Sequence, residues 1–332
     1  MKHLLTIVLL LLVNLVAAQS LEDRLFELAA QSGEVSYEQL LDLAETQLKK
    51  PEEQARFFYY WIALNIEYDE VTAGLDLSTI LDAESTQPMT VFNERKATCM
   101  GFTNLYASFL GYFGIDHKTI VGYSRHRNNL LQRALPALDH AWSAIKIKDE
   151  WKLVEVTWAN LYINHRDLRD HYFMTSPEVF NMDHLPIEED WQLTEEPLSL
   201  SAFTSRPLLD ATYFTYAKDA SIPVEISQNE AGETMVSLSR LPNWKLSATW
   251  VNADNEPVEG LKYKPNKSRS KLTFTLNEFD PGYTLRIDAK KDLPGGKVMV
   301  VSGLAYVQTP SGESAEETSF TASIQKPNRH KD

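Results

Sequence analysis

The order in which helical and strand patterns follow one another most constrains the fold of this chain. Apolar residues recur at helical spacing from Leu21 to about Tyr68, and Ser36 and Pro51 are good helix starters. Another helical run begins near Cys99, and from Lys118 the apolar residues alternate as in strands. Helices followed by an antiparallel sheet predict an α+β core.

Within this core, the polar stretch from Asp69 to Glu94 has no clear period, which predicts a loop. The strand-like runs that follow are KTIVGYS, AWSAIKI and WKLVEVTW. Residues 148–150 separate the last two runs by a tight turn, so these runs are expected to form a hairpin.

After about Thr212 the pattern changes to short alternating runs separated by turn residues. These runs are IPVEIS, TMVSLS, KLSATWVNA, KLTFTLN, YTLRIDA and KVMVVSGLAYVQ. Their number and spacing predict an all-β, immunoglobulin-like sandwich, although the cysteine pair of antibody domains is missing from the sequence.

The first residues have the pattern of an export signal. Lys2 gives a basic start, Leu4 to Val16 is nearly all apolar, and small residues precede Gln19. The apolar stretch is shorter than the ~20 residues of a membrane-spanning helix, so cleavage is favoured over anchoring. We therefore expect a secreted or periplasmic protein without a membrane span after cleavage.

These patterns predict four segments. They are a signal peptide at 1–18, an α+β domain with a helical N-terminal region at 19–209, a β-sandwich accessory domain at 210–308 and a flexible tail at 309–332. The formal net charge of −14 disfavours nucleic acid and anionic lipid as partners.

Cys99 is the only cysteine, so it has no partner for a disulfide within the chain. Its place at a helix start favours the thiolate, because the helix N-terminus carries partial positive charge. His140 begins one strand of the hairpin and Glu155 lies on the next, where the two side chains can meet. A nucleophile with its base is one interpretation, and a buried apolar cysteine beside a polar strand end is the other.

The combination of motifs resembles a known family. The motifs are CMGF at 99–102, GYFGIDHKTIVGY at 111–123, HAW at 140–142 and WKLVEVTW at 151–158. Together they resemble the papain-like core of the transglutaminase-like cysteine enzyme superfamily. The segment 171–193 is similar to the one that follows the core in kyphoscoliosis-peptidase-like members, so the resemblance covers about residues 52–200.

The resemblance implies that Cys99 is the nucleophile and His140 the general base and acid. Glu155 stands where the family usually has Asp, and Asn160 or Asp139 could take its place. The family's oxyanion hole uses the N–H of the cysteine itself. For a side-chain donor, the sequence offers the weak candidates Gln87 and Asn93.

Trp142 and Trp158 flank these residues and are candidates for substrate binding, with core packing as the alternative. The histidines lack metal-ligand spacing, so no metal and no other cofactor is expected.

Two functions remain. One is acyl transfer on amide bonds of a protein or peptide substrate, by hydrolysis or by cross-linking, with peptidase or amidase hydrolysis favoured by the resemblance. The other is an inactive binding protein that holds a peptide or glycan. The oligomeric state cannot be read from the sequence.

Overall fold

The computed structural model describes residues 20–70, 83–126, 138–216, 224–231, 233–239, 241, 243–259, 263–267, 271–276 and 283–308. The chain divides into two compact units, one of residues 1–120 and 140–175 and the other of residues 121–139 and 176–332. The predicted signal peptide and tail lie outside the described residues. The predicted domain boundary at residue 210 falls inside the second unit.

Three helices open the first unit, as the sequence predicts: α2 (Leu21–Gln31), α3 (Tyr37–Gln47) and α4 (Pro51–Asn65). The Ser36 side chain accepts the Gln39 N–H, and the Gln39 side chain returns a bond to the Ser36 N–H. This capping box satisfies two donors at the start of α3. Pro51 occupies the first turn of α4, where its missing N–H costs nothing.

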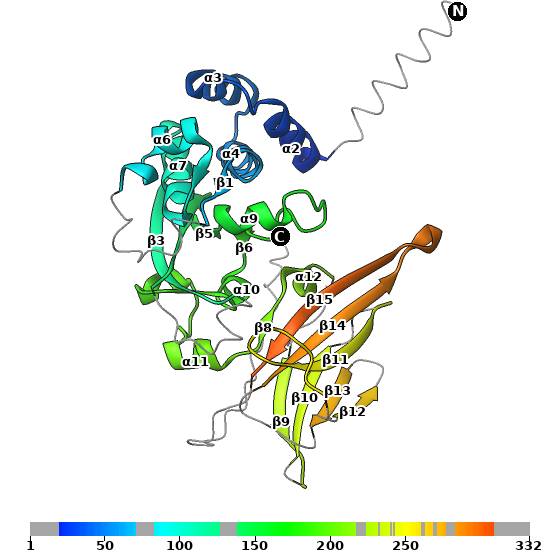
Figure 1. Cartoon of the computed structure of the whole chain (residues 1–332). Coiled ribbons are helices and arrows are strands. Elements are labelled where there is room, and N and C mark those ends of the chain that lie inside the picture. Colours follow the sequence, from blue (N-terminus) through cyan, green and yellow to red (C-terminus); the bar gives the residue numbers. More distant parts are fainter. Residues whose placement is uncertain are drawn as a thin grey trace, which may run out of the picture. The chain divides into compact units, whose positions relative to one another are not determined.

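Helix α4 forms the centre of the first unit. Its side chains from 57 to 63 are at most 1% exposed. It packs against α2, α7 (Cys99–Tyr112) and α9 (Val156–Tyr162) (Figure 1). The rings of Phe58 and Phe109 stack at 4.2 Å between centroids, which ties α4 to α7.

The prediction of a loop from Asp69 to Glu94 is wrong for its second part. The described residues there form η2 (Glu84–Thr86) and α6 (Pro88–Glu94). Pro88 opens α6, and Val91 and Phe92 are buried, so two apolar residues anchor a short helix that shows no period. Strands β1 (Glu67–Tyr68) and β2 (Lys96–Ala97) pair in parallel on either side of this segment.

A five-stranded sheet has the order β6-β5-β4-β3-β7. Its strands are β3 (His117–Ser124), β4 (His140–Ile147), β5 (Glu150–Val154), β6 (Phe173–Thr175) and β7 (His184–Pro186). Strands β4 and β5 form the predicted hairpin, with Ile147 opposite Glu150. Lys148 and Asp149 have φ of 52° and 63°, as a two-residue turn with two left-handed positions requires.

Short elements continue the chain: α10 (Pro177–Phe180), η3 (Glu189–Gln192), α11 (Leu200–Ser205) and α12 (Ala211–Tyr216). Two four-stranded sheets of the second unit have the orders β12-β13-β10-β9 and β11-β14-β15-β8. Their bounds are β8 (Leu208–Leu209), β9 (Val224–Gln228), β10 (Thr234–Ser239), β11 (Lys245–Val251), β12 (Tyr263–Lys267), β13 (Lys271–Leu276), β14 (Thr284–Asp292) and β15 (Val298–Val307).

One hydrophobic core receives side chains from both of these sheets, among them Val236, Phe274, Trp250, Leu285 and Leu304. All six predicted strands are present, and β8 and β12 are additional. The C-terminal region is therefore built of paired sheets, while its immunoglobulin-like character stays a prediction.

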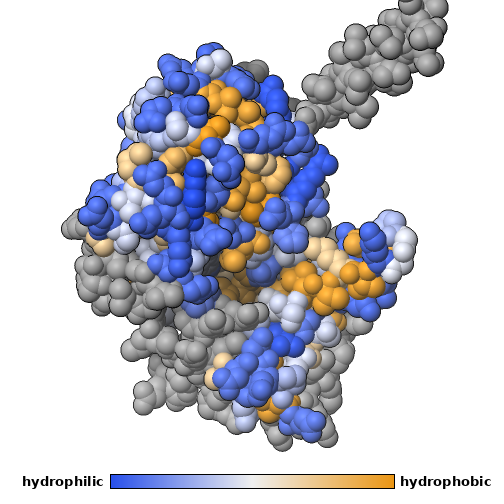
Figure 2. Space-filling model, turned by 45° about the horizontal axis from the view of Figure 1, so that its top comes forward, coloured by the Kyte–Doolittle hydropathy of each residue, from blue (hydrophilic) through white to orange (hydrophobic). Residues whose placement is uncertain are grey.

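The β14–β15 hairpin carries exposed apolar residues: Val298 is 47% and Val300 65% exposed. Figure 2 shows apolar surface on the part of the second unit that carries this hairpin. Among the described residues, the helices are too short or too polar to cross a bilayer.

Candidate active site

Cys99 is the first residue of α7, which confirms the helix start predicted from the sequence. The preceding residue, Thr98, gives the helix no side-chain cap, and the free thiol belongs to a residue that is 3% exposed. An uncapped helix N-terminus carries partial positive charge, and the Cys99 side chain begins at this end of the helix.

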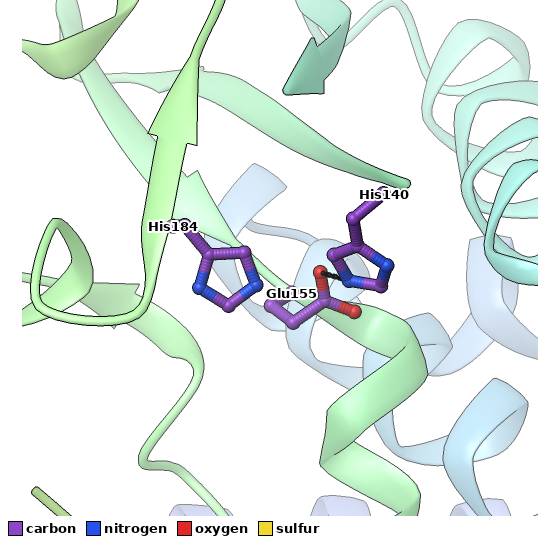
Figure 3. Close-up of side chains that lie close together, drawn as sticks. All are labelled: His140, Glu155 and His184. Carbon is purple, nitrogen blue, oxygen red and sulfur yellow. Dashed lines mark hydrogen bonds and ion pairs between the residues drawn. The ribbon is translucent and has the colours of Figure 1, made fainter. Parts of the chain in front are cut away.

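The neighbour of the thiol is His140, the first residue of β4. The Cys99 side chain is among the groups that raise the pKa of His140, so the thiol lies near the imidazole. The ring atom Nε2 lies 2.9 Å from Oε2 of Glu155 (Figure 3). The imidazole therefore links the single thiol of the chain to a carboxylate, and His140 is itself only 3% exposed.

Glu155 lies one residue beyond the end of β5 and is fully buried. The expected strand from Trp151 to Trp158 is wrong in its second half, because α9 begins at Val156 with Glu155 as its N-cap. The Glu155 Oε1 accepts the N–H of Thr157 at 2.6 Å and that of Trp158 at 3.1 Å. These bonds fix the carboxylate, so Oε2 is held toward His140.

The electrostatics of this pair favour a charged imidazole. Desolvation by burial lowers the pKa of His140, but the charge of Glu155 and the hydrogen bonds to Cys99 and Glu155 raise it, as does the charge of Cys99. The net result is a pKa well above the ordinary histidine value. The site therefore favours a protonated imidazole beside the Glu155 carboxylate.

The two candidate substrate-binding tryptophans both lie near the imidazole. The ring of Trp142 is 6.2 Å and that of Trp158 5.1 Å from the His140 ring. Trp142 is fully buried, which favours its packing role, whereas Trp158 is partly exposed. Substrate binding by either residue stays a prediction.

The other candidates have partners elsewhere. The Asn160 amide donates to the carbonyls of Ala63 and Ile66 at 3.0 and 3.3 Å. Asp139 accepts the N–H of Ser124 at 2.8 Å. Glu155 thus holds the position beside His140 that the sequence left open among three residues.

Gln87 and Asn93, the weak candidates for a side-chain oxyanion donor, are exposed. The sequence reasoning did not consider Thr103, whose buried hydroxyl contacts the helix of Cys99 and the strand of His140. A threonine one helical turn after the cysteine, in a largely apolar run, was the available signal.

Metal binding was not expected. His140, Glu155 and His184 carry potential ligand atoms. The first two hydrogen-bond each other, and His184, in the second unit, has its Nδ1 2.6 Å from Oδ1 of Asp183. The absence of a metal stays a prediction.

Comparisons with known proteins support the resemblance read from the motifs. The model of the transglutaminase-like superfamily matches residues 41–156. Kyphoscoliosis peptidase of Mus musculus is 28% identical over 158 residues, which are 46% of this chain and 23% of that protein. The Homo sapiens protein of the same name is 29% identical over 171 residues, 49% of this chain and 24% of that protein.

The chain thus spans about a quarter of the length of these relatives. A solved TGase structure is 18% identical and covers 41% of this chain and 31% of its own, with a TM-score of 0.28. A putative cysteine protease from Cytophaga hutchinsonii is 19% identical over 41% of this chain and 37% of its own, with a TM-score of 0.26. Residues 41–156 thus match the transglutaminase-like superfamily model, and about half of the chain is similar to kyphoscoliosis peptidases.

Proposed function

We propose that the chain is a cysteine enzyme that transfers acyl groups from amide bonds through a thioester on Cys99. The observation that carries this proposal is the buried pair of His140 and the Glu155 carboxylate, 2.9 Å apart, with Cys99 among the groups that raise the pKa of that imidazole. A thiol is a strong nucleophile when a neighbouring imidazole holds its proton, and a carboxylate that stabilises the imidazolium strengthens this effect.

In the first half of the reaction, the Cys99 thiolate attacks the carbonyl carbon of an amide, and the carbonyl electrons move to the oxygen. The N–H groups at the start of α7 would stabilise that oxyanion. When the oxyanion collapses, the C–N bond breaks and His140 gives its proton to the leaving amine. A thioester on Cys99 and a neutral imidazole remain.

In the second half, His140 takes a proton from the acceptor, which then attacks the thioester carbon and releases the thiolate. Water as acceptor gives hydrolysis, and an amine gives cross-linking. The relatives in Mus musculus and Homo sapiens are named peptidases, which favours hydrolysis of a protein or peptide substrate.

The rest of the chain fits an accessory role in this proposal. The paired sheets of the C-terminal region would form an immunoglobulin-like sandwich that positions the enzyme on a large substrate. The apolar run and small residues before Gln19 favour secretion or a periplasmic location. N-terminal sequencing of the exported protein tests this, and an intact Met1 contradicts it.

Alkylation of Cys99 by iodoacetamide at a series of pH values tests the enzyme proposal. With one cysteine in the chain, all label on the folded protein reports this site. We expect labelling well below the ordinary thiol pKa of about 8.5. A Cys99→Ser variant gives the background.

Turnover of small peptide amides, with and without an added primary amine, then separates hydrolysis from cross-linking. Release of free acid supports the peptidase, whereas incorporation of the amine reassigns the chain to transfer. A thiol that reacts only after denaturation contradicts the proposal and favours the peptide- or glycan-binding alternative.

A further inference from the structure

We infer that Thr103 is a positioning residue of this site, whose hydroxyl holds the helix of the nucleophile against the strand of the base. The inference rests on the proposed function, because the position of Cys99 relative to His140 matters for reactivity only if the two residues act together.

The Thr103 side chain is fully buried in the second turn of α7. Its Oγ1 lies 2.9 Å from the carbonyl oxygen of Cys99 and 3.2 Å from the carbonyl oxygen of Ala141. A hydroxyl carries a single proton, so Thr103 shares it between these two acceptors. One acceptor belongs to the nucleophile itself, and the other belongs to the residue that follows His140 in β4.

The second acceptor distinguishes this contact from ordinary helix chemistry. Threonine side chains within helices commonly bond the carbonyl four residues earlier, and that bond alone is local. The bond to Ala141 crosses 38 positions of sequence and joins α7 to β4. Since threonine and valine have similar helix propensities, the helix gains nothing from the hydroxyl. The contact to β4 explains its presence.

A close packing contact restrains the first turn of α7 as well. A Cβ on Gly101 would lie 2.6 Å from Cβ of Ala97 and 2.9 Å from Cγ2 of Val91. The backbone of α7 at Gly101 therefore packs directly against these two side chains. Packing at Gly101 limits lateral movement of α7, and the hydrogen bond from Thr103 to Ala141 fixes α7 relative to β4. Together these contacts set the distance between the thiol and the imidazole, on which proton transfer depends steeply.

The experiment compares Thr103→Val, which removes the hydroxyl but keeps the shape, with Thr103→Ser, which keeps the hydroxyl. The matched control is Thr86→Val, because Thr86 is 1% exposed and its hydroxyl makes a local bond of 2.7 Å to the Ala83 carbonyl. For each variant, the alkylation rate of Cys99 by iodoacetamide is measured against pH, and urea unfolding gives the stability.

At about pH 6.5, well below the ordinary thiol pKa, we expect Thr103→Val to alkylate about tenfold more slowly than the parent. Its pH profile should move toward that of a free thiol. Thr103→Ser should keep the parent profile, and so should Thr86→Val, even with a similar loss of stability. Thr103→Ala, which also lacks the hydroxyl, serves as the second variant if valine prevents folding.

A folded Thr103→Val or Thr103→Ala protein with the parent pH profile overturns the inference and leaves the proposed function intact. A parent thiol without reactivity at low pH overturns the proposed function, and the inference fails with it. A shifted profile in Thr86→Val also counts against the inference, because any buried hydroxyl would then have the same effect.

Discussion

Replacing Glu155 by Gln changes the charge beside His140 and little else. The Glu155 Oε1 accepts from Thr157 and Trp158, and an amide oxygen can keep both bonds. The amide nitrogen then faces His140 Nε2, where the carboxylate Oε2 lies at 2.9 Å. This nitrogen cannot accept a hydrogen bond from the imidazolium, so the substitution removes both the acceptor and the negative charge that face His140.

The size of the effect follows from the bond that is lost. A hydrogen bond to a charged group contributes about 1.5–3 kcal/mol. Without this bond, the pKa of His140 should fall from its raised position toward the ordinary histidine range. Because about 1.4 kcal/mol is a factor of ten in an equilibrium constant, the charged thiolate–imidazolium form, and with it the alkylation rate of Cys99 at low pH, should fall by about ten- to a hundredfold.

Stability provides a second measurement with a defined pH dependence. The pKa of His140 is raised in the folded protein, so its protonated form stabilises the fold at pH values below the ordinary histidine pKa of about 6.5. This stabilisation is lost as the pH rises through the raised value. The loss of unfolding free energy in Glu155→Gln should thus be largest near pH 6 and shrink as the pH increases.

Urea unfolding and iodoacetamide labelling at matched pH values measure both effects. Glu155→Asp keeps the charge and should retain more of the low-pH labelling than Glu155→Gln. A folded Glu155→Gln protein with the labelling profile and the stability profile of the parent refutes the coupling between this carboxylate and the imidazole.

Three further predictions concern the base beside Cys99, the packing of its helix and the part of the second unit in the chemistry. His140→Ala should abolish low-pH alkylation but leave labelling at alkaline pH, and unchanged low-pH labelling reassigns the base. Gly101→Ala should lower the unfolding free energy by about 1–3 kcal/mol in urea titrations, because its Cβ meets Ala97 at 2.6 Å. Gly111→Ala in the same helix is the control, since its new Cβ finds its nearest atom at 3.5 Å; an equal loss there argues against the close contact. Trp250→Ala, in the core of the second unit, should cost about 3–5 kcal/mol yet preserve the labelling profile, and a changed profile assigns that unit a part in the chemistry.

Much of the first unit could be predicted because local signals and tertiary structure agree. Ser36, Pro51 and Cys99 mark helix starts that the structure places within one residue of the prediction. The pairing of Glu155 with His140 also followed from the hairpin. The backbone conformation at Glu155 could not be predicted in this way, because Val156 and Thr157 continue a strand-like alternation. The helix that begins there instead depends on the Glu155 side-chain cap, which periodicity does not report.

At Pro265 in the second unit, the local sequence again does not predict the observed backbone structure. Proline, asparagine and serine cluster around this residue, a composition typical of a turn between strands. The structure places it in β12, an edge strand that pairs with β13. Edge strands tolerate proline, since a missing N–H facing away from the sheet breaks no ladder bond. Whether a strand is central or at an edge is a property of the sheet, not of the segment.

The burial of α4 predicts that this helix is the last part of the first unit to open to solvent. A helix with seven consecutive side chains at most 1% exposed cannot unwind without disrupting its surroundings. Its amide protons should thus exchange with deuterated water among the slowest in the unit, through global rather than local openings. Helices α7 and α9, which carry Cys99 and the Glu155 cap, both pack on α4. Cys99 and Glu155 are therefore expected to rest on the part of the unit that opens last.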